Sequence, residues 1–154
     1  MLLRAATAAD AGLLLTWASD PTTRAAGFHP EPIEPETHRR WLAQRLASAS
    51  GRLLIGMDGE EPVGEARLDR TEEGRVEVGI AVAPAARGRG VGRILLAAAL
   101  EMARADRVLD PRTFVARIRS DNTISMALFA GAGFHRGAST ECVGVPCYVY
   151  ELDV

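Results

Sequence analysis

Apolar and polar positions alternate in the middle of the chain and then change to a helical spacing. Over residues 75–82, one face of the expected strand carries Val76, Val78, Ile80 and Val82, and the other carries Glu77, Gly79 and Ala81. From residue 91 onward, one helix face carries Val91, Ile94, Leu95, Ala98, Ala99 and Met102. A strand is expected again over residues 113–118, and this strand–helix–strand order implies parallel pairing with a right-handed crossover.

Hairpin signals separate the strands that precede this unit. The expected strands cover residues 2–6, 52–57, 62–69, 75–82, 113–118 and 147–152. The turns Asp58-Gly59 and Glu73-Gly74 are typical of tight hairpins. The strands that flank these turns should therefore pair antiparallel.

Three more helices are expected, each with an apolar face. The first follows a cap at Thr7, presents Leu13, Leu14, Trp17 and Ala18, and stops at Asp20-Pro21. The second begins at Pro35, presents Leu42, Leu46 and Ala49, and ends at Gly51. The last is capped by Asp121 or Asn122, presents Ile124, Ala127 and Leu128, and closes at Gly133-Phe134. The sequence thus predicts an α+β fold, with a mostly antiparallel twisted sheet of about six to seven strands and about four helices.

Length and composition narrow the function. The 154 residues suit one domain, residues 1–154, and a net charge of −2 gives no general attraction to nucleic acid. No signal peptide or membrane span is expected. All 18 Lys-plus-Arg positions are Arg, which excludes a Schiff-base lysine and a P-loop lysine. Cys142 and Cys147 can pair, but reduced thiols in a cytoplasmic protein are expected.

The segment richest in chemical information is the basic glycine turn between the strand at 75–82 and the helix that follows. It places unpaired backbone N–H groups, a positive helix end and several guanidinium groups together, which suits a phosphate or pyrophosphate. A dinucleotide fingerprint fails because Arg93 stands at its third glycine, and a P-loop needs lysine. The pattern Arg/Gln-x-x-Gly-x-Gly/Ala is met in full by residues 87–92.

With this motif the chain resembles the GCN5-related N-acetyltransferase (GNAT) superfamily. The segment Val82-Ala83-Pro84 and the apolar helix after the turn belong to the same family motif. Residues 122–129 and Gly133-Phe134 resemble the family's second signature, in the expected order and at the expected spacing. The resemblance implies a GNAT-like fold, in which the strands before the turn and after the crossover helix splay apart.

The resemblance also implies acetyl-CoA as cosubstrate, no metal, and direct attack by an amine in a ternary complex. The residues that match CoA-binding positions are Ile80, Ala81, Val82, Arg87, Gly88, Arg89, Gly90, Val91, Gly92, Arg93, Asn122 and Phe129. In the family, backbone at residues 80–82 holds the pantetheine arm, and an N–H such as that of Val82 polarises the thioester oxygen. Arg89 either joins this site or is only solvated, and Asn122 either contacts CoA or only caps its helix.

The chain departs from the family at the residue that donates a proton to the leaving thiolate. Family members often have Tyr where Phe129 stands, and Phe129 cannot protonate the departing thiolate. Tyr148 and Tyr150 are either substitutes or packed aromatics. The base that accepts the amine proton is expected among three residues, with the first preferred: Glu77, Glu65 and His38.

The acceptor amine is addressed by the N-terminal third. Residues 17–24 and 38–41 resemble the Trp-x-Asn-Asp-Pro-x-x-Arg and His-x-x-Trp pattern of acetyltransferases acting on nucleotide-linked 4-amino sugars, although Ser19 replaces the Asn. Related tryptophan segments occur in ribosomal-protein N-terminal acetyltransferases. The expected acceptor residues are Trp17, Arg24, His38 and Trp41, unless the two tryptophans are core anchors.

Three functions stay open at this point. The first is acetylation of a small-molecule amine, with an amino sugar as the suggested acceptor. The second is acetylation of a protein or peptide N-terminus, and the third is non-catalytic CoA binding in a regulatory protein. A homodimer is common in the family, but no residue here specifies an interface.

Overall fold

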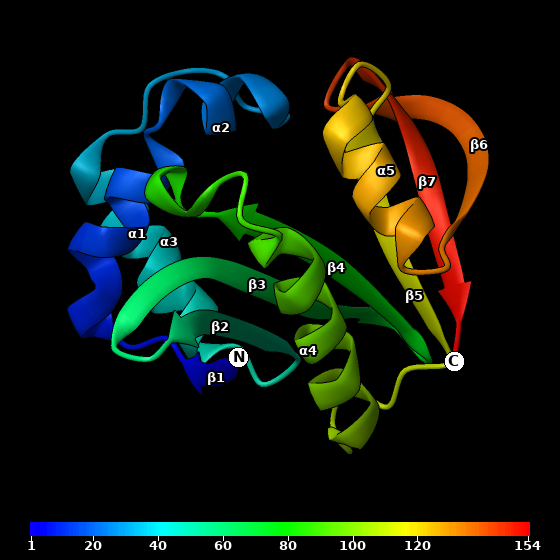
Figure 1. Ribbon diagram of the computed structural model, residues 1–154, viewed down its shortest axis with the longest axis horizontal. Coiled ribbons are helices and arrows are strands. Elements are labelled where there is room, and N and C mark those ends of the chain that lie inside the picture. The colour runs from blue at the N-terminus through cyan, green and yellow to red at the C-terminus, as the bar shows by residue number, and fades with distance from the viewer.

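The computed structural model describes all residues, 1–154, as one seven-stranded sheet with helices on both faces (Figure 1). The strands are β1 (Leu2–Ala5), β2 (Gly51–Asp58), β3 (Glu61–Glu72), β4 (Arg75–Val82), β5 (Thr113–Arg119), β6 (His135–Cys142) and β7 (Val145–Asp153). Their order across the sheet is β1-β2-β3-β4-β5-β7-β6. The helices are α1 (Ala11–Ala18), α2 (Pro21–Ala26), α3 (Pro35–Ala47), α4 (Val91–Ala105) and α5 (Thr123–Gly131), with short 3₁₀ turns η1 (Ala8–Asp10) and η2 (Pro84–Ala86).

The expected α+β architecture is confirmed, with one helix more than expected. Asp20-Pro21 stops α1 and also begins α2. The Asp20 carboxylate accepts the N–H of Thr23 at 3.0 Å, and Pro21 takes the first helical position. None of the helices combines the length and the apolar character that a membrane crossing requires.

The sheet opens between β4 and β5. These are its only parallel neighbours, and they pair only through Arg75–Glu77 and Thr113–Val115. Beyond Glu77, β4 continues beside β3 alone, so β4 and β5 diverge as the arms of a V (Figure 1). The parallel crossover through α4 and the splayed pair of strands are therefore present.

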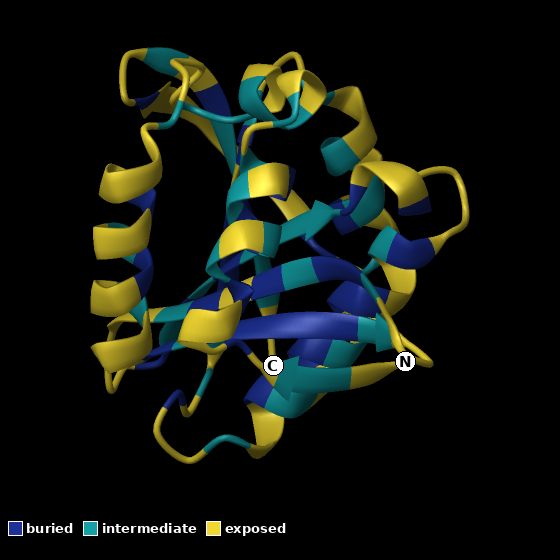
Figure 2. Cartoon of the chain, turned by 90° about the vertical axis from the view of Figure 1, so that its left-hand side faces the viewer, coloured by how far each residue is buried: buried dark blue, intermediate teal, exposed yellow.

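Two apolar layers cover the two faces of the sheet. The larger one joins α4 and α5 to strand residues such as Val76 and Phe114. The smaller one packs α1 and α3 on the opposite face, through residues such as Leu14 and Leu42. Figure 2 shows the central strands buried and the outward surfaces of the helices exposed. The sheet that contains the diverging strands β4 and β5 is therefore packed on both of its faces.

Five residues expected on buried helix faces lie at the surface instead. The exposed fractions of Leu46, Ile94 and Ile124 are 38%, 47% and 84%, and Ala49 and Ala127 are exposed as well. Leu46 lies in the last turn of α3, which ends at Ala47 and not at Gly51. Ile124 lies in the first turn of α5. Helical spacing identifies a stripe, but residues at its rim and at helix ends reach past the layer they would cover.

The β6 strand and the state of the cysteines differ from expectation. β6 is an edge strand whose residues from His135 to Glu141 are all exposed, so it shows no apolar alternation. It forms a hairpin with β7 that brings Cys142 and Cys147 to a Cα–Cα distance of 6.1 Å. The structure joins them in a disulfide, so the expectation of reduced thiols is wrong.

Candidate functional site

The glycine turn connects the end of β4 to the start of α4. Gly88 and Gly90 have φ values of +75° and +74°, a region in which other residues are strained. A Cβ at either position would meet no atom within 4 Å. Backbone conformation, and not crowding, therefore requires glycine here, and the outer side of the turn stays open.

A row of backbone amides at this turn has no acceptor within the protein. The first bonded N–H of α4 is that of Ile94, which donates to the Gly90 carbonyl at 3.5 Å. The N–H groups from Gly88 to Arg93 donate to no backbone or side-chain acceptor. They adjoin the positive end of the α4 dipole, and this combination favours a phosphate or pyrophosphate.

Arg87 is tied to α2. It donates to Oδ2 of Asp20 at 2.6 Å and to Oγ1 of Thr23 at 3.0 Å. The guanidinium of Arg87, with the N–H of Thr23, holds the pKa of Asp20 below its ordinary value. Asp20 was not expected to take part in the site, because an Asp-Pro pair signals the end of one helix as well as the start of another.

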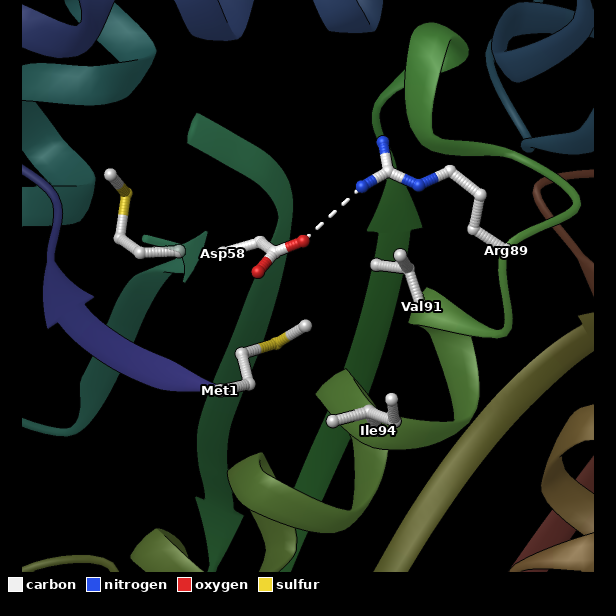
Figure 3. A pocket seen from close by; sticks show the side chains of 6 residues that line it. Met1, Asp58, Arg89, Val91 and Ile94 are labelled. Carbon is white, nitrogen blue, oxygen red and sulfur yellow. Dashed lines mark hydrogen bonds and ion pairs between the residues drawn. The ribbon is translucent and has the colours of Figure 1, made fainter. Parts of the chain in front are cut away.

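Arg89 and Arg93 have different surroundings. Arg89 reaches to the β2–β3 hairpin, where it lies 3.2 Å from Asp58 and 3.5 Å from Glu61. It lines a pocket of about 250 Å³ together with Met1, Met57, Asp58, Val91 and Ile94 (Figure 3). Arg93 is exposed and forms no ion pair. Of the three arginines of the turn, Arg93 alone has a charge that no carboxylate offsets.

The last residues of β4 border the gap between the diverging strands. The N–H of Ala83 donates to the Val63 carbonyl on β3 at 2.9 Å. Backbone groups alternate between the two edges of a strand, so the N–H of Val82 points to the other edge, on the side of the gap. Val78 is buried, whereas Ile80 and Val82, on the same face, are half-buried. This end of β4 thus offers an extended, accessible backbone edge.

The start of α4 approaches the second half of α5 beside this edge. A Cβ at Gly92 would lie 3.4 Å from Cγ2 of Val82 and 3.6 Å from a methyl group of Leu128. Asn122 caps α5, since its Oδ1 accepts the N–H of Ser125 at 3.1 Å. The capping role that was one of the two alternatives for Asn122 is therefore present, and its side-chain nitrogen has no partner within the protein.

The aromatic residues near α5 are packed. Phe129 is buried and meets Phe134 edge to face, with 5.1 Å between the ring centroids. Tyr150 is buried in the larger apolar layer. Tyr148 is half-buried, and the guanidinium of Arg136 lies 4.8 Å from the centre of its ring. Tyr148 is the more accessible of the two phenols.

Glu65 and Glu77 occupy different levels of the V. Glu65 of β3 pairs with Ala81, at the open end of β4. Glu77 pairs with Asp69 on β3 and with Val115 on β5, where the sheet is still closed. Glu65 therefore lies closer along the strands to the accessible backbone edge.

The two carboxylates also differ in environment. The side chain of Glu65 is 15% exposed and that of Glu77 is 33% exposed. Burial raises the pKa of Glu65, and the charges of Arg67 and Arg45 partly oppose that rise. Arg117 lies 3.9 Å from the carboxylate of Glu77. No group of three or more His, Cys, Asp or Glu side chains is placed to bind a metal ion.

The four acceptor candidates come from α1, α2 and α3. Trp17 is buried in the smaller apolar layer, so it is a core anchor. His38 is also buried, and its ring centroid lies 5.2 Å from that of the half-buried Trp41. Burial lowers the pKa of His38, and the positive charge of Arg24 lowers it further. Both effects favour the neutral form of the His38 imidazole.

Helix α2 is fixed to both arms of the V. Its N-cap residue, Asp20, bonds Arg87 of the glycine turn at 2.6 Å. Directly after it, the Gly27 carbonyl accepts a hydrogen bond from Arg119, the last residue of β5, at 3.1 Å. Figure 1 shows α2 at the open end of the V. The glycine turn and the end of β5 are thereby joined through α2.

Comparison with known proteins matches residues 1–135 to the acetyltransferase (GNAT) domain family. The N-alpha-acetyltransferase RimI of Mycobacterium tuberculosis is 35% identical over 112 residues, 72% of this chain and 60% of the relative. Phosphinothricin N-acetyltransferase of Streptomyces coelicolor is 32% identical over 124 residues, 76% of this chain and 71% of the relative. The match thus spans less than two thirds of the length of RimI.

Solved structures show the same fold along the whole chain. The ribosomal-protein-alanine N-acetyltransferase of Brucella melitensis has a TM-score of 0.84 at 26% identity, with 100% of both chains covered. An aminoglycoside acetyltransferase in complex with coenzyme A has a TM-score of 0.86 at 20% identity, covering 98% of this chain and 93% of its own. The names of these proteins point to different acceptors, so the likeness concerns family and fold.

Proposed function

The chain belongs to the GNAT acetyltransferase family, and on that premise we propose that it transfers the acetyl group of acetyl-CoA to a primary amine of a small molecule. The observation that carries this proposal is the row of backbone N–H groups from Gly88 to Arg93 without a protein acceptor. A diphosphate supplies both the negative charge and the many acceptor oxygens that this row lacks.

The residues around the gap fit the rest of such a molecule. Charge-assisted hydrogen bonds from the turn are worth about 1.5–3 kcal/mol each. The free edge of β4 at residues 80–82 offers backbone groups to the amides of a pantetheine arm, in the manner of strand addition. Bound acetyl-CoA supplies an activated thioester, and the N–H of Val82 is the donor that we assign to its carbonyl oxygen.

A base is needed because an amine attacks only after losing its extra proton. We assign this role to Glu65 ahead of Glu77. Glu65 is paired with Ala81 beside the open edge, and the raised pKa of its carboxyl group favours its action as a proton acceptor near neutral pH. Glu77, the residue that sequence position alone favours, lies where β4 and β5 are still joined.

The thiolate that leaves needs no dedicated acid. Phe129 has no proton to give and is packed against Phe134. A thiol has an ordinary pKa of about 8.5, which makes its anion a tolerable leaving group. We therefore assign protonation of the thiolate to water or to the accessible phenol of Tyr148.

Acetylation of a protein N-terminus is the second candidate, and the 35% identity to RimI favours it. An open acidic groove would suit a peptide with a positively charged terminus. The pocket beside α2 is instead about 400 Å³, and Arg24 is the only charged residue in its lining. A pocket of this size and charge fits a compact acceptor better than an extended chain.

An acceptor screen tests the reaction. Acetyl-CoA is supplied with small amines, amino sugars and short peptides, and free CoA thiol is measured. Thiol release that depends on a small amine supports the proposal, and release that depends only on a peptide supports the second candidate. If none of the amines or peptides in the screen causes thiol release, both candidates are contradicted.

CoA binding is tested separately by calorimetry. Gly90→Val introduces a side chain where φ is +74° and where a diphosphate approaches the backbone. We expect this variant to lose CoA binding while Arg40→Gln, at an exposed position on α3, keeps it. Unchanged affinity in the Gly90 variant would refute the assigned site.

A further inference from the structure

The pocket beside α2 contains an arginine whose charge nothing in the pocket offsets. The pocket lies between α2 and the loop that leads to α3, and it is lined by Ser19, Pro21, Arg24, Ala25, Pro30, Pro32 and Ile33. No carboxylate is among these residues. An uncompensated cation in a concave site favours an anionic ligand.

The guanidinium of Arg24 is also short of hydrogen-bond acceptors. Its single hydrogen bond runs from Nη1 to the Glu31 carbonyl, at 3.3 Å. Its Nε is buried and has no partner, and Arg24 forms no ion pair. Arg87 and Arg89, in the glycine turn, each contact a carboxylate. Because a buried donor without an acceptor is costly, Arg24 is suited to an acceptor that arrives with a ligand.

The position of α2 connects this pocket to the gap in the sheet. α2 carries Arg24 and is fixed at its start to the glycine turn and after its end to β5, through Arg87 and Arg119. The helix that carries Arg24 therefore lies at the open end of the V. The residues that would hold the acetyl donor occupy the same end.

We propose that Arg24 binds an anionic group of the acceptor, so that the substrates are small amines carrying a carboxylate or a phosphate. This inference rests on the acetyltransferase function proposed above. The planar guanidinium donates a pair of parallel hydrogen bonds to either anion. The amine at the other end of such a molecule is left free to face the gap.

Matched pairs of amines test the proposal. Ethanolamine is compared with O-phosphoethanolamine, glucosamine with glucosamine 6-phosphate, and propylamine with β-alanine. Thiol release from acetyl-CoA gives kcat/KM for each compound, and calorimetry in the presence of CoA gives its affinity. We expect the member with the phosphate or carboxylate, in at least one pair, to bind at least about tenfold more tightly than the member without it, the equivalent of about 1.4 kcal/mol.

The variants Arg24→Gln and Arg24→Lys separate charge from geometry. Arg24→Gln should remove the preference for the anionic member, Arg24→Lys should retain part of it, and Arg40→Gln should leave it unchanged. A preference for phosphate over carboxylate, or the reverse, identifies the anion. Thermal unfolding and the affinity for CoA show whether each variant is folded.

Two results would overturn the proposal and leave the acetyltransferase function standing. One is equal binding of the amines with and without the phosphate or carboxylate, by unaltered protein that still binds CoA. The other is a preference for the anionic member that survives in Arg24→Gln. If the unaltered protein does not bind CoA, the proposed function itself is contradicted.

Discussion

Asp20 and Arg87 join α2 to the glycine turn through a contact of 2.6 Å. The same Asp20 oxygen accepts the N–H of Thr23 at 3.0 Å and so caps α2. One carboxylate therefore starts a helix and fixes the turn that follows β4. The two sides of the candidate site are coupled by a single side chain.

Substitution of Asp20 should separate its two roles. Asn caps a helix about as well as Asp but carries no charge for Arg87, whereas Ala does neither. We expect Asp20→Ala to lower stability more than Asp20→Asn. We expect both variants to raise KM for the acceptor several-fold, with a smaller change in CoA affinity. Steady-state kinetics and chemical unfolding measure these effects, and an unchanged acceptor KM in both variants would contradict the coupling.

The two glycines at the start of α4 should respond in opposite directions to alanine. Gly90→Ala places a Cβ at a φ of +74° and should cost about 1–2 kcal/mol. Gly92 is inside the helix, and its Cβ would stay 3.4 Å from Val82, so Gly92→Ala should stabilise by about 0.5–1 kcal/mol. Urea unfolding of the two variants checks both signs. Destabilisation by Gly92→Ala would show that this contact is too tight.

Glu65→Gln should raise stability and lower activity. The pKa of Glu65 is raised in the folded protein, so the folded state holds this proton more firmly than the unfolded state. The free energy of unfolding therefore falls as pH rises from the ordinary pKa of Glu to the raised one. Gln removes this loss, so the variant should exceed the unaltered protein in stability at pH 7 and match it at pH 4. Thermal unfolding at both pH values measures the difference.

The same variant tests the assigned base. If Glu65 accepts the amine proton, kcat/KM of Glu65→Gln should lose the acid limb of its pH profile. Glu77→Gln, on the neighbouring strand, should keep that limb. The opposite result would transfer the role to Glu77 and show that register is a poor guide here.

The disulfide between Cys142 and Cys147 should matter for stability and not for acetyl transfer. It closes the β6–β7 hairpin, on the far side of β5 from β4, and neither sulfur has a role in the proposed reaction. The chain-entropy relation gives a loss of about 2 kcal/mol when so short a loop is opened. The loss is measured by unfolding of the double variant Cys142→Ala/Cys147→Ala. Unfolding of the unaltered protein with and without reductant gives a second measurement. A matching fall in kcat would contradict the separation of roles.

Sequence periodicity predicts elements whose two faces differ in environment. The strand with Val76 and Val78 alternates because only one of its faces meets α4 and α5. Periodicity does not predict β6 because nearly all of its residues are exposed. Sequence patterns do not predict α2 because an Asp-Pro pair is typical both of the end of one helix and of the start of another.

The candidate site was predictable where it is built from backbone and hidden where it depends on distant partners. The glycine motif marks the free amides because Gly88 and Gly90 require positive φ. The partner of Arg87 lies 67 residues earlier in the chain, and no local pattern connects them. The preference for Glu65 over Glu77 needs the register of β3 on β4, which spacing along one strand does not contain.

Because β4 and β5 pair only through Arg75–Glu77 and Thr113–Val115, the two halves of the sheet share a short backbone connection. Beyond these residues, the halves are connected only by side chains and by α2. A molecule bound between them should couple the two halves, and its binding should therefore slow amide exchange in β4 and β5 together.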